Sequence, residues 1–297
     1  MIPPFELHRP ATLEEAVELL AELGEAARIH AGGTELVLML QEGFVEASHL
    51  VDIKLIRGLR DIRLDPSGGW LVLGATARHD EIARSEVVRE RFPTLASLES
   101  VLANQRVRNA GTIGGNLAFA EPHADPPALL VAAGAHLRLE HAGGGRTVPL
   151  HGWIRGPFDP ELEPGEVLTE VRVPLPAGRR AFGYERFRAL ERPSLGVAVR
   201  MDADAAGAVT GARVVVGCVG GAPQLVEGAE AILAGADHRS LEAVLPAVAE
   251  AVEQGIEAET DPHGPEDYKR HLAGVLTGRA LMRAAQARTI QSGSKTS

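Results

Sequence analysis

Two glycine-rich segments constrain this chain more than any other feature of its sequence. The first, Gly32-Gly33-Thr34, follows a short apolar run and precedes a helical pattern. The second, Gly111–Asn116, lies within a polar stretch, residues 106–125, that is too irregular for one helix or strand. Glycines let a backbone approach an anion closely, and the N–H groups of such turns bind phosphate oxygens. The two segments together favour a dinucleotide held by loops from two subdomains.

Other nucleotide-binding patterns are missing from the sequence. Neither glycine segment matches Gly-x-Gly-x-x-Gly, the Rossmann fingerprint. None of the three lysines, Lys54, Lys269 and Lys295, follows a glycine as a Walker A lysine does. Taken alone, Gly32-Gly33-Thr34 is also typical of an ordinary strand-to-helix turn. Only the two segments together favour a bound nucleotide.

Composition excludes several classes of protein. The 297 residues suggest two domains, each long enough to bury a core. One cysteine, Cys218, cannot form an internal disulfide or supply an iron–sulfur cluster or zinc knuckle, and it is expected to be a small buried apolar residue. A formal charge of −10 argues against binding through nucleic-acid phosphates.

Neither a membrane span nor a metal site is expected. No apolar run reaches about 18 residues, and Met1–Pro4 lacks the basic and apolar regions of a signal peptide, so a cytoplasmic protein is expected. The 11 histidines form no His-Glu-x-x-His motif and no close cluster along the sequence. We expect residues 268–271 to form a solvated or partner-facing surface.

Hydrophobic periodicity predicts an α+β chain with a boundary at Pro174–Gly178. Helices are expected over 12–23, 36–43, 80–88, 94–103, 126–133, 225–233, 241–254 and 266–287. Strands are expected over 27–31, 50–53, 59–64, 70–74, 135–140, 167–173, 182–188, 196–201 and 212–218. Asp125 is expected to cap the helix that begins at Pro126. The expected domains are 1–177, with subdomains of about 1–57 and 58–177, and 178–290, followed by a disordered tail, 291–297.

Three motifs identify a resemblance to a known family. Ala31–Leu36, Arg108–Ala118 and Asp125–Leu130 resemble the FAD-binding, or medium, subunit of molybdenum hydroxylases, the family of aerobic-type carbon monoxide dehydrogenases and xanthine dehydrogenases. The similarity continues at residues 4–16 and 261–272, and so spans nearly the whole chain. It implies a vanillyl-alcohol-oxidase (PCMH) type FAD domain of two subdomains, followed by a C-terminal α+β domain with a three-stranded sheet and helices.

The resemblance also implies a division of work among subunits. Non-covalently bound FAD on this chain would receive electrons from iron–sulfur clusters on a small subunit and pass them to an external acceptor. The molybdenum cofactor and the substrate chemistry would lie on a large subunit, in a dimer of heterotrimers. This chain would then carry no catalytic residue, no metal, no membrane span and no nucleic-acid site.

The resemblance assigns cofactor contacts to two loops and to three single positions. The first loop would surround the FAD pyrophosphate, and the second would close over the diphosphate and ribityl region. Asp125 would accept a hydrogen bond from a hydroxyl, and Leu168 and Arg188 would contact the ring system, where a cation stabilises the reduced flavin. The expected contacts are Ile29, Ala31, Gly32, Gly33, Thr34, Glu35, Thr112, Gly114, Gly115, Asn116, Ala118, Asp125, Leu168 and Arg188.

Two neighbouring positions have separate expectations. Ser194 stands where carbon monoxide dehydrogenases carry an aromatic residue beside the flavin, so carbon monoxide is not inferred as the substrate. His30, just before the first loop, is expected to be a spacer and not a covalent flavin tether. Two alternatives stay open, a self-contained FAD-dependent oxidoreductase and a scaffold subunit that has lost FAD. The first lacks support, because no acid–base pair is evident outside the cofactor motifs.

Overall fold

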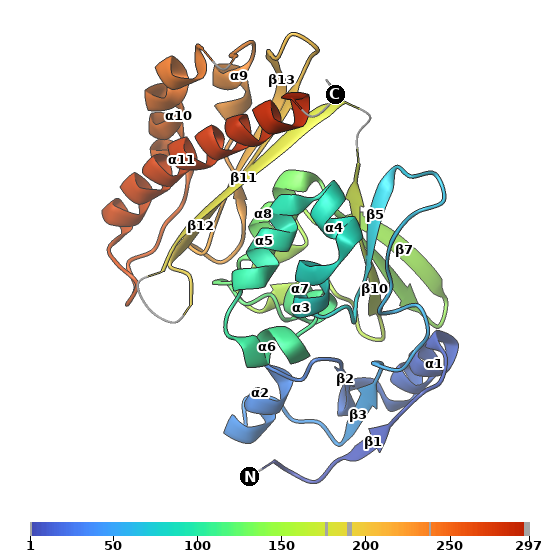
Figure 1. The fold of residues 1–297 in the computed structure, drawn as a ribbon. Coiled ribbons are helices and arrows are strands. Elements are labelled where there is room, and N and C mark those ends of the chain that lie inside the picture. Colours follow the sequence, from blue (N-terminus) through green and yellow to red (C-terminus); the bar gives the residue numbers. More distant parts are fainter. Residues whose placement is uncertain (1, 176–177, 189–191, 238, 294–297) are drawn as a thin grey trace. The chain divides into compact units, whose positions relative to one another are not determined.

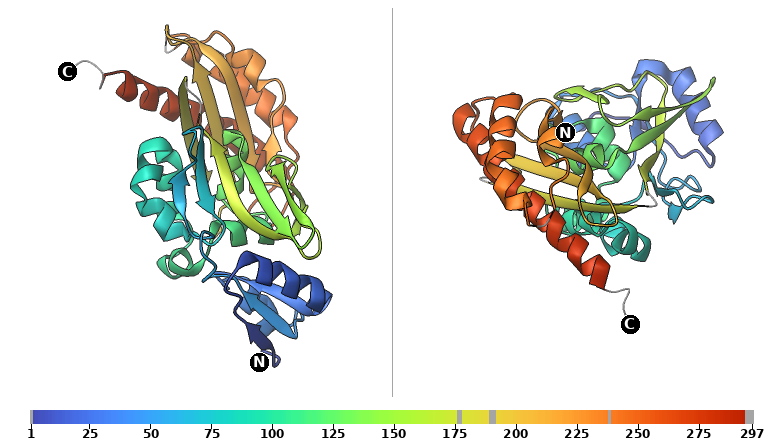
Figure 2. Two further views of the ribbon diagram at one scale, coloured as in Figure 1. Left: turned by 90° about the vertical axis from the view of Figure 1, so that its right-hand side faces the viewer. Right: turned by 90° about the horizontal axis from the view of Figure 1, so that it is seen from above.

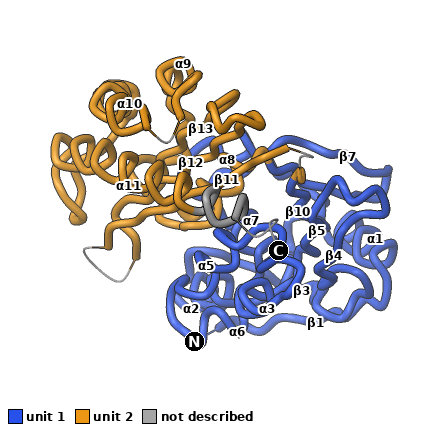
Figure 3. The backbone as a smooth tube through the Cα atoms, turned by 45° about the horizontal axis from the view of Figure 1, so that its top comes forward, with its two compact units in different colours: residues 1–120, 135–173 blue, residues 121–134, 174–297 orange. Residues whose placement is uncertain are grey.

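The structure is a computed structural model that describes residues 2–175, 178–188, 192–237 and 239–293 (Figure 1). The chain forms two compact units, and each is described by itself (Figure 3). Unit 1 comprises residues 1–120 and 135–173, and unit 2 comprises residues 121–134 and 174–297. Ala177, at the expected domain boundary, lies outside the described residues.

A small parallel sheet opens unit 1. Its strands, in the order β1-β3-β2, are β1 (Glu6–His8), β3 (His49–Asp52) and β2 (Ala27–His30). Helix α1 (Leu13–Leu23) packs on this sheet through Val17 and Leu20, which share a buried cluster with Val51. The Thr12 side chain accepts a hydrogen bond from the Glu15 amide at 3.2 Å, and this cap starts the helix where it was expected.

A five-stranded sheet forms the rest of the unit 1 framework, in the order β4-β5-β10-β6-β7. Its strands are β4 (Ile62–Leu64), β5 (Trp70–Gly74), β10 (Val167–Pro174), β6 (His136–His141) and β7 (Gly144–Pro149). A two-stranded pair joins β8 (Ile154–Gly156) to β9 (Asp159–Pro160). The helical elements are η1 (Gly24–Ala26), α2 (Leu36–Glu42), α3 (His79–Arg84), α4 (Glu86–Arg91), α5 (Pro93–Val101), α6 (Gln105–Ala110) and α7 (Ile113–Phe119).

Two helical regions of unit 1 differ from the prediction. The stretch expected to be irregular contains α6 and α7, because Asn104 and Thr112 each cap a short helix with their side chains. The single helix expected over 80–88 is two helices, α3 and α4. They separate at Ser85, whose hydroxyl accepts a hydrogen bond from the Val88 amide and so starts α4.

Unit 2 contains a sheet with helices on both of its faces. The strands, in order, are β11 (Arg179–Phe187), β12 (Leu195–Ala203), β13 (Val209–Gly217) and β14 (Gln224–Leu225). The helices are α8 (Pro126–Ala133), α9 (Ala229–Leu233), α10 (Leu241–Gly255) and α11 (Glu266–Gly293). The expected three-stranded sheet thus gains β14, because Leu225 pairs with Val215 and does not begin a helix.

Both faces of this sheet are buried, which explains the apolar runs in its strands. Val197 and Val199 share a core cluster with residues of α10 and α11, which lie along one face (Figures 1 and 2). A Cβ on Gly217 would lie 3.1 Å from the Ala128 Cβ of α8, so α8 covers the other face. Strands covered on both sides lose the alternation of apolar and polar residues.

Three further expectations can be compared with the structure. Cys218 is buried, as predicted. Lys269 is not part of a solvated surface, because it is 1% exposed and its ammonium lies 2.6 Å from an Asp261 carboxylate oxygen. Helix α11 continues past Ala287 to Gly293, and residues 294–297 of the expected tail lie outside the described residues. Within the described ranges, no helix is long and apolar enough to cross a membrane.

Candidate functional site

The first glycine segment joins β2 to α2 in unit 1. Ile29 is half-buried within β2, and Ala31–Glu35, also half-buried, form the connecting loop. Gly33 has φ of +70°, a left-handed conformation that favours glycine. Among the described residues, the backbone amides of Gly32, Gly33 and Thr34 donate to no acceptor. The loop therefore presents successive N–H groups that can bind an anion.

The second glycine segment is fastened to the chain that follows β5. The amides of Ile113 and Gly114 donate to the carbonyls of Ala77 and Ala75, at 3.0 and 2.9 Å. The Gly115 amide donates to the Thr112 hydroxyl oxygen at 3.1 Å, which caps α7. These amides are already used within the protein. Polar contacts from this loop to a ligand must come mainly from side chains.

Asn116 carries an unsatisfied polar atom. Its side-chain Oδ1 is buried and has no hydrogen-bond partner among the described residues. A buried amide oxygen without a donor costs about 1–3 kcal/mol, so such atoms are uncommon in proteins. Ala118, half-buried, lies further along the same helix, and Leu168 is buried in β10. A bound group that donates a hydrogen bond to Asn116 would remove this cost.

The two glycine segments lie in contact within unit 1. A Cβ on Gly32 would lie 2.5 Å from the Ala110 carbonyl oxygen and 2.8 Å from the Gly111 Cα. Gly114 is equally enclosed, since its Cβ would lie 2.5 Å from the Ala75 Cβ. The fold thus brings together two loops that are about 80 residues apart in sequence, as expected.

Asp125 and Arg188 belong to unit 2, where Asp125 lies at the start of α8. The expected cap is wrong, because Asp125 has helical φ and ψ and its side chain caps no amide. Its carboxylate instead accepts hydrogen bonds from the Tyr184 hydroxyl at 2.5 Å and the Arg186 guanidinium at 2.6 Å. Burial raises the pKa of Asp125, against the opposing effect of Arg186. Arg188 is exposed at the end of β11.

Sequence reasoning missed Tyr184 and Arg186 as members of this polar cluster. Their signal is the alternation of Tyr184 and Arg186 along β11, which places both polar side chains on one strand face, with Arg188 directly after the strand. Ser194, at the position where carbon monoxide dehydrogenases were expected to carry an aromatic residue, is buried. Its hydroxyl lies 3.1 Å from Nδ1 of His263, whose ring packs beside His123 with centroids 4.6 Å apart.

His30 lies beneath the first loop and is held by two charged residues. Its Nδ1 is 3.1 Å from the Lys54 ammonium and 3.8 Å from an Asp52 carboxylate oxygen. Burial, together with Lys54, lowers the pKa of His30. A Cβ on Gly33 would lie 2.7 Å from the His30 Nε2, so the imidazole supports the loop closely. This support agrees with the spacer role, which stays a prediction.

Comparisons with known proteins match both parts of the chain. Residues 3–176 match the family described as the FAD binding domain in molybdopterin dehydrogenase. Residues 181–284 match the CO dehydrogenase flavoprotein C-terminal domain. Together, these two matches define an FAD-binding flavoprotein of the molybdopterin dehydrogenase class.

Individual relatives agree over nearly their whole length. The carbon monoxide dehydrogenase medium chain of Hydrogenophaga pseudoflava is 38% identical over 95% of this chain and 97% of that one. A subunit of the 6-hydroxypseudooxynicotine dehydrogenase complex of Paenarthrobacter nicotinovorans is 32% identical over 95% of each chain. One solved structure is that of carbon monoxide dehydrogenase from Hydrogenophaga pseudoflava lacking the Mo-pyranopterin moiety of its cofactor. One of its chains superimposes on this chain with a TM-score of 0.89 at 37% sequence identity. The superposition covers 97% of this chain and 99% of that one.

The chain belongs to the family of FAD-binding medium subunits of molybdenum hydroxylases. This confirms the family, the fold class and the FAD cofactor expected from the sequence. The relatives are subunits of dehydrogenase complexes, so the chain is an oxidoreductase subunit. The individual FAD contacts stay predictions.

Proposed function

We propose that this chain is the electron-transfer subunit of a heteromeric molybdenum hydroxylase. Its FAD would receive electrons from iron–sulfur clusters on a small partner subunit and pass them to an external acceptor. A large partner subunit would carry the molybdenum cofactor and the substrate site. The two touching glycine loops of the FAD-binding domain carry this proposal, because they combine unused amides with an unsatisfied buried oxygen.

The residues of unit 1 fit a ligand that has both phosphates and hydroxyls. The Gly32, Gly33 and Thr34 amides can bind phosphate oxygens without any lysine. The Asn116 amide oxygen can accept a hydrogen bond from a hydroxyl of FAD. This bond would orient the ribityl part of the cofactor, which links the phosphates to the flavin ring. When bound, FAD supplies a redox centre that accepts an electron pair and releases it to an acceptor. The protein itself binds, positions and shields that centre.

The lone cysteine supports the division of work among subunits. Cys218 is buried, and burial raises the pKa of its thiol, so it is not poised as a thiolate ligand. Iron–sulfur clusters need several cysteine ligands, which this chain does not have. The clusters of the proposed relay must therefore be held by another chain. The medium chains among the relatives support an assembly of three kinds of subunit, proposed as a dimer of heterotrimers.

Flavin titration of the purified full chain tests this site. We expect Asn116→Ala to weaken FAD binding about tenfold, because one hydrogen bond in a buried site contributes about 1–1.5 kcal/mol. The matched control is Asn109→Ala, which removes an exposed asparagine from the preceding helix. Unchanged FAD affinity in Asn116→Ala would remove Asn116 from the site. A full chain that binds no FAD would overturn the proposed function.

Turnover measurements separate this proposal from a self-contained oxidoreductase. The isolated chain is expected to oxidise no organic donor at a significant rate, even when loaded with FAD. The complex with its partners is expected to do so. Turnover of an organic donor by the isolated chain, equal to that of the complex, would contradict the electron-transfer role.

A further inference from the structure

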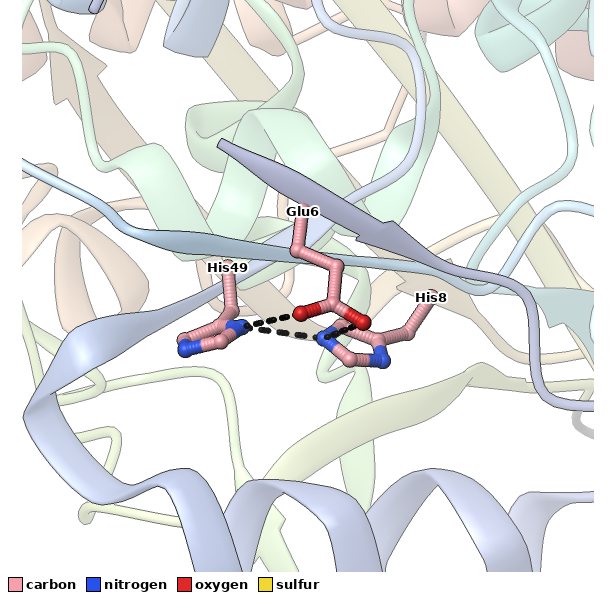
Figure 4. Close-up of side chains that lie close together, drawn as sticks. All are labelled: Glu6, His8 and His49. Carbon is pink, nitrogen blue, oxygen red and sulfur yellow. Dashed lines mark hydrogen bonds and ion pairs between the residues drawn. The ribbon is translucent and has the colours of Figure 1, made fainter. Parts of the chain in front are cut away.

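Three possible metal ligands converge at the edge of the small parallel sheet. Glu6 and His8 are two residues apart on β1, so their side chains share one face of the strand. The parallel register pairs Glu6 with His49 of β3, which brings the third side chain to the same place. Figure 4 shows the carboxylate and both imidazoles directed toward one another.

The distances within this trio suit a single ion. His8 Nε2 lies 3.0 Å from His49 Nδ1. The Glu6 carboxylate oxygens lie 4.0 Å from His8 Nε2 and 3.8 Å from His49 Nδ1. Donor atoms bound tetrahedrally to one Zn²⁺ at about 2.0–2.2 Å lie about 3.3–3.6 Å apart. The three separations differ from that range by no more than about 0.4 Å, which small side-chain rotations can supply.

Exposure leaves room for an ion and for water. The Glu6 side chain is 67% exposed, whereas those of His8 and His49 are 18% and 25% exposed. The imidazoles are therefore held in place by the sheet, while the carboxylate closes the site from the solvent side. The other ring nitrogen of each histidine points away from the trio (Figure 4), where it is free of the three ligand atoms and can donate to water, as the second nitrogen of a metal-bound imidazole commonly does.

We propose that Glu6, His8 and His49 form a binding site for a divalent transition-metal ion of the kind that imidazole prefers, with Zn²⁺ as its representative. Two imidazoles and one carboxylate supply three protein ligands, and water completes the coordination. The bound ion links β1, a strand of three residues, to β3 across the parallel pair. The site was not expected from the sequence, and it goes beyond the proposed electron-transfer function.

Zinc binding to the untagged full chain tests the proposal. After removal of metals with a chelator, isothermal titration with Zn²⁺ is expected to show one site that is lost in His49→Ala. Mutation of a residue that only hydrogen-bonds to a metal ligand weakens metal binding about 10–100-fold. Loss of the His49 ligand itself should therefore weaken Zn²⁺ binding at least about 100-fold. Glu6→Gln, at an exposed position, keeps the side-chain shape and is expected to weaken binding as well.

His151→Ala is the matched control, because it removes an exposed histidine from a turn elsewhere in unit 1. This variant should bind Zn²⁺ as the wild type does. The proposal fails if the wild type binds no Zn²⁺, or if His49→Ala and Glu6→Gln bind it as tightly as the control. FAD content of the same samples is expected to be equal, so failure here leaves the proposed function unaffected.

Discussion

Gly32 is a position at which the fold of unit 1 leaves no room for a side chain. The Ala110 carbonyl oxygen and the Gly111 Cα occupy the space of a Cβ, so even alanine must push one glycine loop away from the other. Both of these neighbours are backbone atoms, which cannot move aside as a flexible side chain would. The contact between the loops therefore depends on this glycine.

Gly32→Ala is expected to weaken FAD binding and to destabilise the chain by about 1–3 kcal/mol, the usual cost of overpacking. Flavin titration and chemical denaturation measure the two effects. Gly156→Ala is the control, because a Cβ there meets no atom within 4 Å and the residue needs no left-handed backbone. Equal behaviour of the two variants would show that the loops do not need their close contact.

His30 gives the chain a pH dependence that can be assigned to one residue. Burial and Lys54 lower its pKa in the folded state, so the unfolded chain binds the proton more readily. The contribution of His30 to the free energy of unfolding is therefore fully present above about pH 6.5, the ordinary pKa of histidine. This contribution is lost as the pH falls below that value.

The expected result is a smaller decline in unfolding free energy below about pH 6.5 for His30→Gln than for the wild type. Denaturation at a series of pH values measures this decline. His151→Ala, which removes an exposed histidine, should follow the wild type. Parallel curves for wild type and His30→Gln would rule out the assignment to His30.

At the scale of elements, a buried hydrogen bond between a histidine and a carboxylate joins α3 to α5 close to the second glycine loop. The His79 Nδ1 lies 2.6 Å from a Glu99 carboxylate oxygen, and both residues are almost fully buried. The His79 amide also donates to the Gly111 carbonyl, and a Cβ on Gly111 would lie 3.1 Å from the imidazole. The pair thus supports the loop from beneath.

Removing one partner of a buried hydrogen bond leaves the other polar group unsatisfied, at a cost of about 1–3 kcal/mol. Glu99→Ala is expected to destabilise the chain by about that amount in chemical denaturation. Glu90→Ala, at an exposed position of α4, should change stability by no more than about 0.5 kcal/mol. A similar small change for Glu99→Ala would show that the pair contributes nothing to the fold.

Local sequence patterns predicted most helices and strands, but they could not predict contacts between residues that are far apart in the sequence. The cap at Thr12 and the proline start at Pro126 are encoded within a few residues, so α1 and α8 were found. The helices α6 and α7 are too short for periodicity to show, and only the caps Asn104 and Thr112 reveal them. Asp125 was misread as a cap because its partners, Tyr184 and Arg186, lie about 60 residues away.

The metal-ligand trio illustrates the same limit. Glu6 and His49 are brought together only by the parallel register of β1 and β3, which no spacing in the sequence displays. Each glycine loop, in contrast, could be recognised from its own glycine-rich sequence. Their contact still had to come from the fold, since Gly32 and Ala110 meet across a long stretch of chain.

At the scale of the whole molecule, charge and cysteine content agree with the proposed role. With only three lysines and a formal charge of −10, the chain has few lysines for phosphates, and the unused amides of the first loop can bind them instead. A single buried cysteine leaves iron–sulfur clusters to a partner. The chain alone should therefore be a flavoprotein without iron–sulfur clusters or molybdenum.

Cofactor analysis of the isolated chain, beside the complex purified from its native cell, tests the central claim most directly. We predict bound FAD and neither iron–sulfur clusters nor molybdenum in the isolated chain, and FAD, iron–sulfur clusters and molybdenum in a complex of three kinds of subunit. An isolated chain without flavin, or a native complex that contains neither iron nor molybdenum, would contradict the proposed function.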